Sequence, residues 1–125
     1  MWLAAVSVAV GAALGAVLRW GLGVWLNPLI KWLPLGTLVA NWAGGRLAGV
    51  ALAWFELHPQ WPPAVRLLCV TGFLGGLTTF STFSAEVTGL LLATQYAQAL
   101  IAALLHLLGS LAMTVLGVSM VRLWL

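Results

Sequence analysis

Charged side chains are scarce in this sequence. Two acidic and five basic residues make up 6% of its 125 positions, whereas a soluble domain carries about 25%. Hydrophobic residues make up 63%, so the composition predicts an integral membrane protein. The basic residues are scattered rather than clustered, which argues against a nucleic-acid-binding surface. The length predicts a single transmembrane domain over residues 1–125.

Groups that carry out catalysis are also scarce. The single cysteine, Cys69, cannot form an intramolecular disulfide and lies in an apolar run, as expected of a buried structural thiol. The two histidines, His58 and His106, are far apart in the sequence, and neither has an evident nucleophile partner or metal-ligand cluster. We therefore do not expect an enzyme.

Four apolar segments are long enough to cross a bilayer, which takes roughly 20 helical residues. They cover residues 2–26, 35–55, 64–93 and 97–124. As one straight helix, the third segment would reach about 45 Å, against a bilayer core of about 30 Å. We expect an all-α membrane protein with four transmembrane helices, the third broken near its centre by a glycine-rich stretch.

The positive-inside rule does not orient this chain. Four crossings would place Arg66 and Arg122 on one side of the membrane, and Lys31, with Arg19 near it, on the other. Neither side has the clear excess of basic residues that orientation requires. Either one basic residue decides the orientation, or the chain inserts in both directions. We favour dual insertion, which leads to an antiparallel homodimer in the membrane lipid.

Pairs of glycines spaced four residues apart offer places where helices could approach closely. The signal is weak, because glycine is common in membrane helices. The pairs are Gly11 with Gly15, Gly45 with Gly49, and Gly72 with Gly76.

The stretch from Gly72 to Glu86 is the most unusual part of the apolar sequence. It combines glycines, serines, threonines and an acid inside a segment long enough to span a membrane. Non-helical backbone at membrane depth persists only where protein or a water-filled cavity covers it. The stretch therefore indicates an ion or substrate site rather than a plain anchor.

Three polar residues of different segments are expected at a similar membrane depth. They are Arg19, Asn41 and Glu86, and an arginine, an amide and a carboxylate at one level could form a vestibule. Each also has a simpler interpretation. Arg19 could extend to the lipid headgroups, Asn41 could form an interhelical hydrogen bond, and Glu86 could lie near the interface or pair with Arg19.

The fourth segment carries a row of polar side chains. His106, Ser110 and Thr114 are spaced at i, i+4 and i+8, which places them on one helical face. Each alone could be a helix–helix contact. Together, on an otherwise apolar helix, they are equally consistent with the polar lining of a conduction path.

Two phenylalanines add a second candidate lining. Phe80 and Phe83 share a helical face and are interleaved with Ser81 and Thr82. Core packing is the simple interpretation. However, an aromatic ring is positive at its edge, so ring edges and hydroxyl donors could line a path for a small anion. Such a lining offers no carboxylate ring for cations.

These residues together resemble the Fluc/CrcB family of small fluoride channels, and the resemblance covers essentially the whole chain. The run Gly-Gly-Leu-Thr-Thr-Phe-Ser-Thr-Phe-Ser-x-Glu, which ends at Glu86, is close to a family signature. The other matching parts are residues 15–20, residues 36–44, and the His106-x-x-x-Ser110-x-x-x-Thr114 row.

The resemblance implies a function and a setting. It implies passive, highly selective export of fluoride through two pores of a dual-topology homodimer. The setting would be the plasma membrane of a prokaryote, which is the inner membrane of a Gram-negative cell.

The resemblance also implies roles for individual residues. Asn41, Phe80 and Phe83 would contact the ion, Ser110 and Thr114 would form the polar track, and Glu86 would be a pore-associated acid. A structural Na⁺ would bind backbone carbonyls of Gly75 and Thr78 in both subunits. Arg46 departs from the family pattern, which more usually has an apolar or aromatic residue there.

Two rival functions remain open. A small four-helix proton-coupled multidrug exporter also has short spans and dual topology, but it needs an acid in its first span. The first span here carries only Arg19. A structural or assembly subunit is the other rival, and it would not need a polar track.

Overall fold

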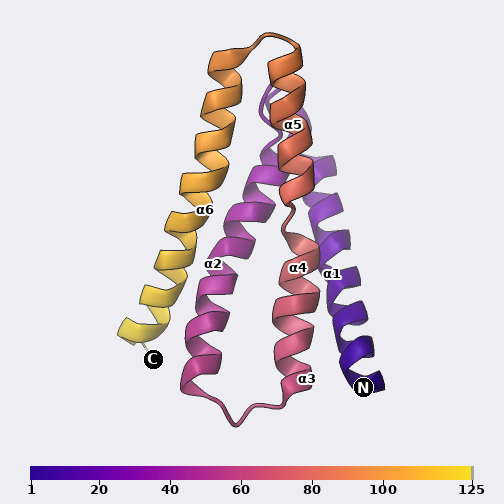
Figure 1. Ribbon diagram of the computed structural model, residues 1–125, viewed down its shortest axis with the longest axis vertical. Coiled ribbons are helices and arrows are strands. Elements are labelled where there is room, and N and C mark those ends of the chain that lie inside the picture. Colours follow the sequence, from indigo (N-terminus) through magenta and orange to yellow (C-terminus); the bar gives the residue numbers. More distant parts are fainter. Residues whose placement is uncertain (125) are drawn as a thin grey trace.

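The computed structural model of this chain describes residues 1–124, which form helices joined by short loops (Figure 1). Both termini and the α2–α3 loop lie at one end of the molecule, and η1 and the α5–α6 turn lie at the other. The chain therefore makes four passes along the long axis, the third of which is assembled from several pieces. In chain order the elements are α1 (Trp2–Leu26), the 3₁₀ turn η1 (Asn27–Leu29), α2 (Leu35–Leu57), α3 (Pro63–Arg66), the π-helical segment η2 (Leu67–Leu74), α4 (Gly75–Leu77), α5 (Phe80–Leu92) and α6 (Tyr96–Trp124).

In the described part of the chain, three helical stretches are long and apolar enough to cross a membrane: Trp2–Leu29, Pro63–Leu92 and Tyr96–Trp124. The chain is therefore a multi-pass membrane protein. The 23-residue helix α2 is not among them, because residues such as Asn41 and Arg46 lower its hydropathy. A crossing by α2 stays a prediction.

The third pass is not one continuous α-helix. It begins with α3 and the π-helical segment η2, which the sequence did not predict. Between α4 and α5, Thr78 (φ −86°, ψ 152°) and Thr79 (φ −149°, ψ 115°) are extended. The sequence indicated the glycines as the place of unwinding, but Gly75 is helical (φ −62°, ψ −38°). The extended residues are instead the two threonines that follow.

The glycines of this pass serve close packing. A Cβ atom on Gly72 or Gly76 would overlap the backbone of α1, and one on Gly11 or Gly15 would overlap the backbone of the third pass. On the other side of α2, a Cβ on Gly49 would overlap the backbone of α6. The close helix approach predicted from the glycine pairs is confirmed for two pairs of passes, α1 with the third pass and α2 with α6.

Aromatic contacts order the α2–α3 loop. The His58 ring stacks on Trp54 with centroids 4.0 Å apart, and Trp61 contacts Trp54 edge-on at 6.0 Å. His58 Nδ1 lies 2.9 Å from the Trp54 carbonyl oxygen. Because a carbonyl oxygen can only accept, this nitrogen carries a proton.

Candidate ion pathway

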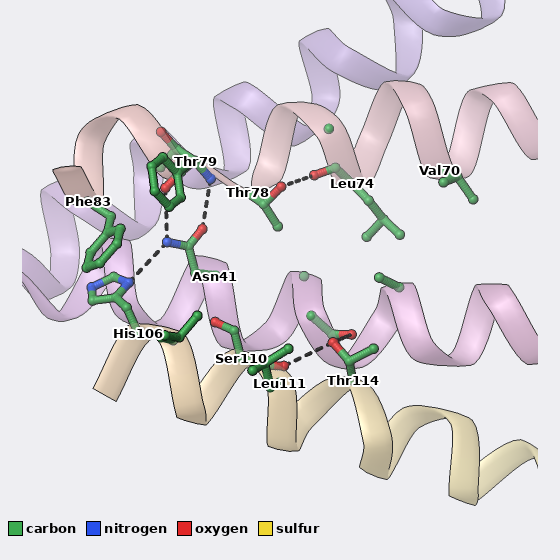
Figure 2. Close-up of a pocket in the computed structure, with 16 residues that line it drawn as sticks. Asn41, Val70, Leu74, Thr78, Thr79, Phe83, His106, Ser110, Leu111 and Thr114 are labelled. Carbon is green, nitrogen blue, oxygen red and sulfur yellow. Dashed lines mark hydrogen bonds between the residues drawn. The ribbon is translucent and has the colours of Figure 1, made fainter. Parts of the chain in front are cut away.

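A cavity of about 480 Å³ lies against the interrupted third pass, between it, α2 and α6 (Figure 2). Its apolar wall includes Val70, Leu74, Leu107 and Leu111. The remaining wall carries hydrogen-bonding and aromatic groups, and none of its lining residues has a carboxylate, ammonium or guanidinium group. These polar and aromatic residues are Asn41, Thr78, Thr79, Phe80, Phe83, His106, Ser110 and Thr114.

The cavity brings together most of the site residues expected from the sequence. Asn41, both phenylalanines and the three polar residues of α6 line it, as do Gly75 and Thr78. Ser81 and Thr82 belong to the first turn of α5 but do not line the cavity.

The amide of Asn41 binds the extended backbone between α4 and α5. Its Oδ1 accepts from the Thr79 N–H at 2.8 Å, and its Nδ2 donates to the Thr79 carbonyl at 3.1 Å. Nδ2 also lies 3.2 Å from Nδ1 of His106. Figure 2 shows Asn41 reaching from α2 to Thr79 on one side and to His106 of α6 on the other. The interhelical hydrogen bond expected for Asn41 is thus present, and its partner is Thr79, in the interruption of the third pass.

Other side chains bond backbone groups at the ends of the two helices. Arg19 of α1 donates through Nε to the Gly76 carbonyl at 3.1 Å, which places a cation at the C-terminal end of α4, where the helix dipole favours it. Thr78 Oγ1 donates to the Leu74 carbonyl at 2.8 Å. Thr79 caps α5 by accepting from the Thr82 N–H at 3.1 Å. Thr79 was not among the residues expected to line the pore or bind Na⁺, although it belongs to the hydroxyl-rich stretch in which the break was expected.

Diverted hydrogen bonds leave two carbonyl groups of the interruption without their helical donors. In a continuous helix, the Thr79 N–H would bond the Gly75 carbonyl and the Thr82 N–H would bond the Thr78 carbonyl. Here the first donates to Asn41 and the second to Thr79 Oγ1. The carbonyls of Gly75 and Thr78 are therefore released from helical pairing.

The two phenylalanines have different surroundings. Phe80 is 77% exposed, so packing within this chain does not account for it. Its ring meets Phe83 edge-on at 5.4 Å with an interplanar angle of 75°. Phe83 in turn stacks on His106 at 4.5 Å. The aromatic row therefore runs from the exposed surface of the chain to a buried imidazole.

The hydroxyl of Thr114 lies between two helices. Its Oγ1 is 3.0 Å from the Gly45 carbonyl and 2.9 Å from the Ser110 carbonyl, and it can donate to either. Thr114 thus makes a helix–helix contact while it lines the cavity. The two interpretations of this residue, a helix–helix contact and a lining of the path, are compatible.

Glu86 belongs to a second, smaller cavity. Its Oε2 accepts from Thr37 Oγ1 at 2.7 Å, and it lines a space of about 330 Å³ together with Lys31 and Gln95. Glu86 is not part of the ion pair found in residues 1–124, which joins Arg122 to Glu56 at 4.0 Å. The structure thus does not join Arg19, Asn41 and Glu86 in one vestibule.

Arg46, the residue that departs from the family pattern, lies on the exposed side of α2. Its Nη2 is 3.6 Å from the sulfur of Met120 on α6. It does not line the main cavity.

Similarity to known proteins identifies the family of this chain. The family model described as "CrcB-like protein, Camphor Resistance (CrcB)" matches residues 6–118. The chain belongs to the CrcB family. A relative from Chromohalobacter salexigens named fluoride-specific ion channel FluC is 59% identical, over 95% of this chain and 90% of its own length. A FluC from Nitrosospira multiformis is 56% identical, over 95% of this chain and 92% of its own. The expected family resemblance is confirmed, and the CrcB relatives are named as ion channels.

Proposed function

We propose that this chain is a fluoride-selective channel that lets cytoplasmic fluoride leave the cell passively and so confers fluoride resistance. The observation that carries the proposal is the chemistry of the main cavity. Its polar wall consists of neutral groups, namely the amide of Asn41, an imidazole and hydroxyls, beside the ring edges of Phe80 and Phe83. The names of the relatives, fluoride-specific ion channels, agree with this chemistry.

Neutral donors suit a small anion. A strongly hydrated ion enters a narrow path only where close donors replace its water. A fixed cation in the wall would bind the anion too tightly to release it, and a carboxylate would repel it. Ser110, one turn beyond His106 on α6, would continue the donor row, and Thr114, one turn further, would line the path with a hydroxyl whose hydrogen bonds a carbonyl.

The complete pathway requires a second copy of the chain in this proposal. The main cavity adjoins Phe80, whose ring is 77% exposed in the single chain. An antiparallel partner would cover this ring and close the cavity, giving two pores per dimer. The near balance of basic residues at the two ends of the molecule supports insertion in both directions. In this dimer α2 would be the fourth membrane crossing, shielded from lipid by the neighbouring helices.

A structural Na⁺ fits the interruption of the third pass. The carbonyls of Gly75 and Thr78 have lost their helical donors, and unpaired carbonyls at membrane depth cost several kcal/mol each, roughly. Neutral backbone oxygens are ligands that Na⁺ accepts in broken membrane helices. These two carbonyls, with their symmetry mates in the partner subunit, would hold the ion. Its role would be to stabilise the dimer and to keep Phe80 in place.

We place the channel in the plasma membrane of its prokaryotic host, the inner membrane if that host is Gram-negative. The multidrug exporter remains the alternative, but no described feature favours it. The only charged residue of α1 is Arg19, which bonds the Gly76 carbonyl, so the first pass has no acid to exchange protons.

The decisive experiment is ion efflux from liposomes that contain the purified protein. Fluoride should leave rapidly once a potassium ionophore removes the opposing voltage, and chloride should stay inside. Comparable loss of both anions would refute fluoride selectivity. Absence of fluoride loss from vesicles with correctly assembled protein would refute the channel function.

A further inference from the structure

We propose that His106 is a positioning residue: as a neutral imidazole protonated on Nε2, it holds the Asn41 amide in the orientation that binds Thr79. This inference deepens the proposed function and rests on it. It assigns a chemical state and a task to a buried residue that the pathway otherwise uses only as lining.

The backbone of Thr79 fixes which end of the Asn41 amide is oxygen. The Thr79 N–H can only donate, so the atom 2.8 Å away is Oδ1. The Thr79 carbonyl can only accept, so the atom 3.1 Å away is Nδ2. The assignment follows from the two backbone groups and does not depend on His106.

The amide orientation then fixes the protonation of His106. Nδ2 of Asn41 has two hydrogens and no acceptor capacity. One hydrogen is used by Thr79, and the other faces Nδ1 of His106 at 3.2 Å. Nδ1 must therefore be an unprotonated acceptor, and the single proton of the neutral ring is on Nε2. An imidazolium would set an N–H group against the NH₂ group and break this bond.

Packing keeps the imidazole in place. The side chain of His106 is buried, with 4% of its surface exposed. Its ring stacks on Phe83 with an interplanar angle of 29°. Nε2, on the opposite side of the ring from Asn41, is buried and has no hydrogen-bond partner among residues 1–124. The only hydrogen bond that orients this ring is thus the one to Asn41, and it links α6 to α2 and, through Asn41, to the interruption.

The protonation state can be measured directly, because the chain has two histidines with opposite expected states at Nδ1. Nδ1 of His58 is protonated, since it faces the Trp54 carbonyl. Solid-state NMR of the full chain, labelled with ¹⁵N-histidine in lipid bilayers at neutral pH, should show one protonated and one unprotonated Nδ1. The His58→Gln variant should remove the protonated Nδ1 signal. A protonated Nδ1 on His106 would overturn the proposal.

The positioning role is tested by three substitutions. His106→Asn keeps an acceptor near the place of Nδ1, His106→Gln places its amide near Nε2, and His106→Leu keeps neither. In liposomes, fluoride efflux through the Asn variant should be faster than through the other two by about tenfold, which corresponds to roughly one hydrogen bond. Because Asn and Gln are both amides, their comparison holds even if the Leu variant does not fold.

Two flux results would contradict the proposal. Equal rates for the Asn and Gln variants would mean that the acceptor at Nδ1 does not matter, and a faster Gln variant would assign the function to Nε2. If the unmodified protein passes no fluoride, the proposed function fails, while the NMR experiment still decides the His106–Asn41 contact on its own.

Discussion

Replacing Asn41 by alanine is the most direct test of how the interrupted pass is held. The substitution removes the acceptor of the Thr79 N–H, the donor to the Thr79 carbonyl and the contact with His106. A hydrogen bond is worth about 1 kcal/mol net in water and about 0.6 kcal/mol on average between membrane helices. Leaving the Thr79 N–H unpaired adds a desolvation cost, while the Thr79 carbonyl, as that of the N-cap residue, still accepts the first hydrogen bond of α5; we therefore expect a total loss of roughly 2–4 kcal/mol.

The chain supplies a matched control in its only other asparagine. Asn27, in the first loop, accepts one hydrogen bond from the Gly36 N–H at 2.7 Å and lines neither cavity. Asn27→Ala should cost about 1 kcal/mol, the value of one hydrogen bond. It should leave fluoride efflux close to that of the unmodified protein.

The assay compares both variants with the unmodified protein in two measurements. Fluoride efflux from liposomes reports conduction, and denaturant titration of the protein in bicelles reports stability. Asn41→Ala should lower efflux at least about tenfold, because a loss of 1.4 kcal/mol in ordering the path already gives that factor. If the Asn41→Ala variant conducts normally and is no less stable than Asn27→Ala, the hydrogen bonds between Asn41 and Thr79 do not hold the interruption in place.

Three further predictions use the same preparations. Phe80→Ile should lower fluoride efflux with the protein still assembled, since the ring has little packing within its own chain to lose and isoleucine keeps bulk against the partner, whereas Phe83→Ile should lower both efflux and stability. Normal efflux in both variants would mean that the two rings serve packing alone. Arg19→Met should destabilise the protein by about 1–3 kcal/mol, because the Gly76 carbonyl loses a charged donor, and Arg19→Lys should lower the stability by less. Equal losses of stability in the two variants would show that charge at this carbonyl is unimportant. Single cysteines at Gln60 or Gln95, in a background without the native cysteine, should each be labelled from both sides of the membrane; one-sided labelling would exclude dual insertion.

The helical passes could be predicted well because they depend on length and apolarity. The first segment was expected at residues 2–26, and α1 is Trp2–Leu26. The expected fourth segment, 97–124, differs from α6 by one residue at its start. A run of apolar residues bounded by prolines or polar loops has few alternatives to a helix in a bilayer.

The interior of the third pass was less predictable. Glycine-rich sequence predicts backbone freedom, yet Gly75 is helical and the extended residues are Thr78 and Thr79. The partners of this opening are distant in the sequence: the Thr79 N–H donates to Asn41, and Arg19 donates to the nearby Gly76 carbonyl. Local propensity could not reveal these partners, because tertiary contacts decide where the helix opens.

The interruption also explains why residues expected in one vestibule have separate partners. A break in a membrane helix requires a new partner for each backbone group that loses its helical bond. Asn41 accepts the Thr79 N–H, and Arg19 donates to the Gly76 carbonyl. Glu86, a carboxylate, can only accept while it is ionised, and it therefore bonds a hydroxyl instead of a carbonyl.

The need for new hydrogen-bond partners makes threonine a better residue than glycine at the two extended positions, 78 and 79. Glycine would allow the extended backbone but would bring no side chain to the released groups. Thr78 returns its hydroxyl to the Leu74 carbonyl at the end of α4, and Thr79 caps the start of α5. These hydroxyls each bond one backbone group beside the break, and the Gly75 and Thr78 carbonyls, without their helical donors, would be available to a ligand from outside the chain. Glycine is required earlier in the pass, at Gly72 and Gly76, where α1 must approach closely enough for Arg19 to reach the break.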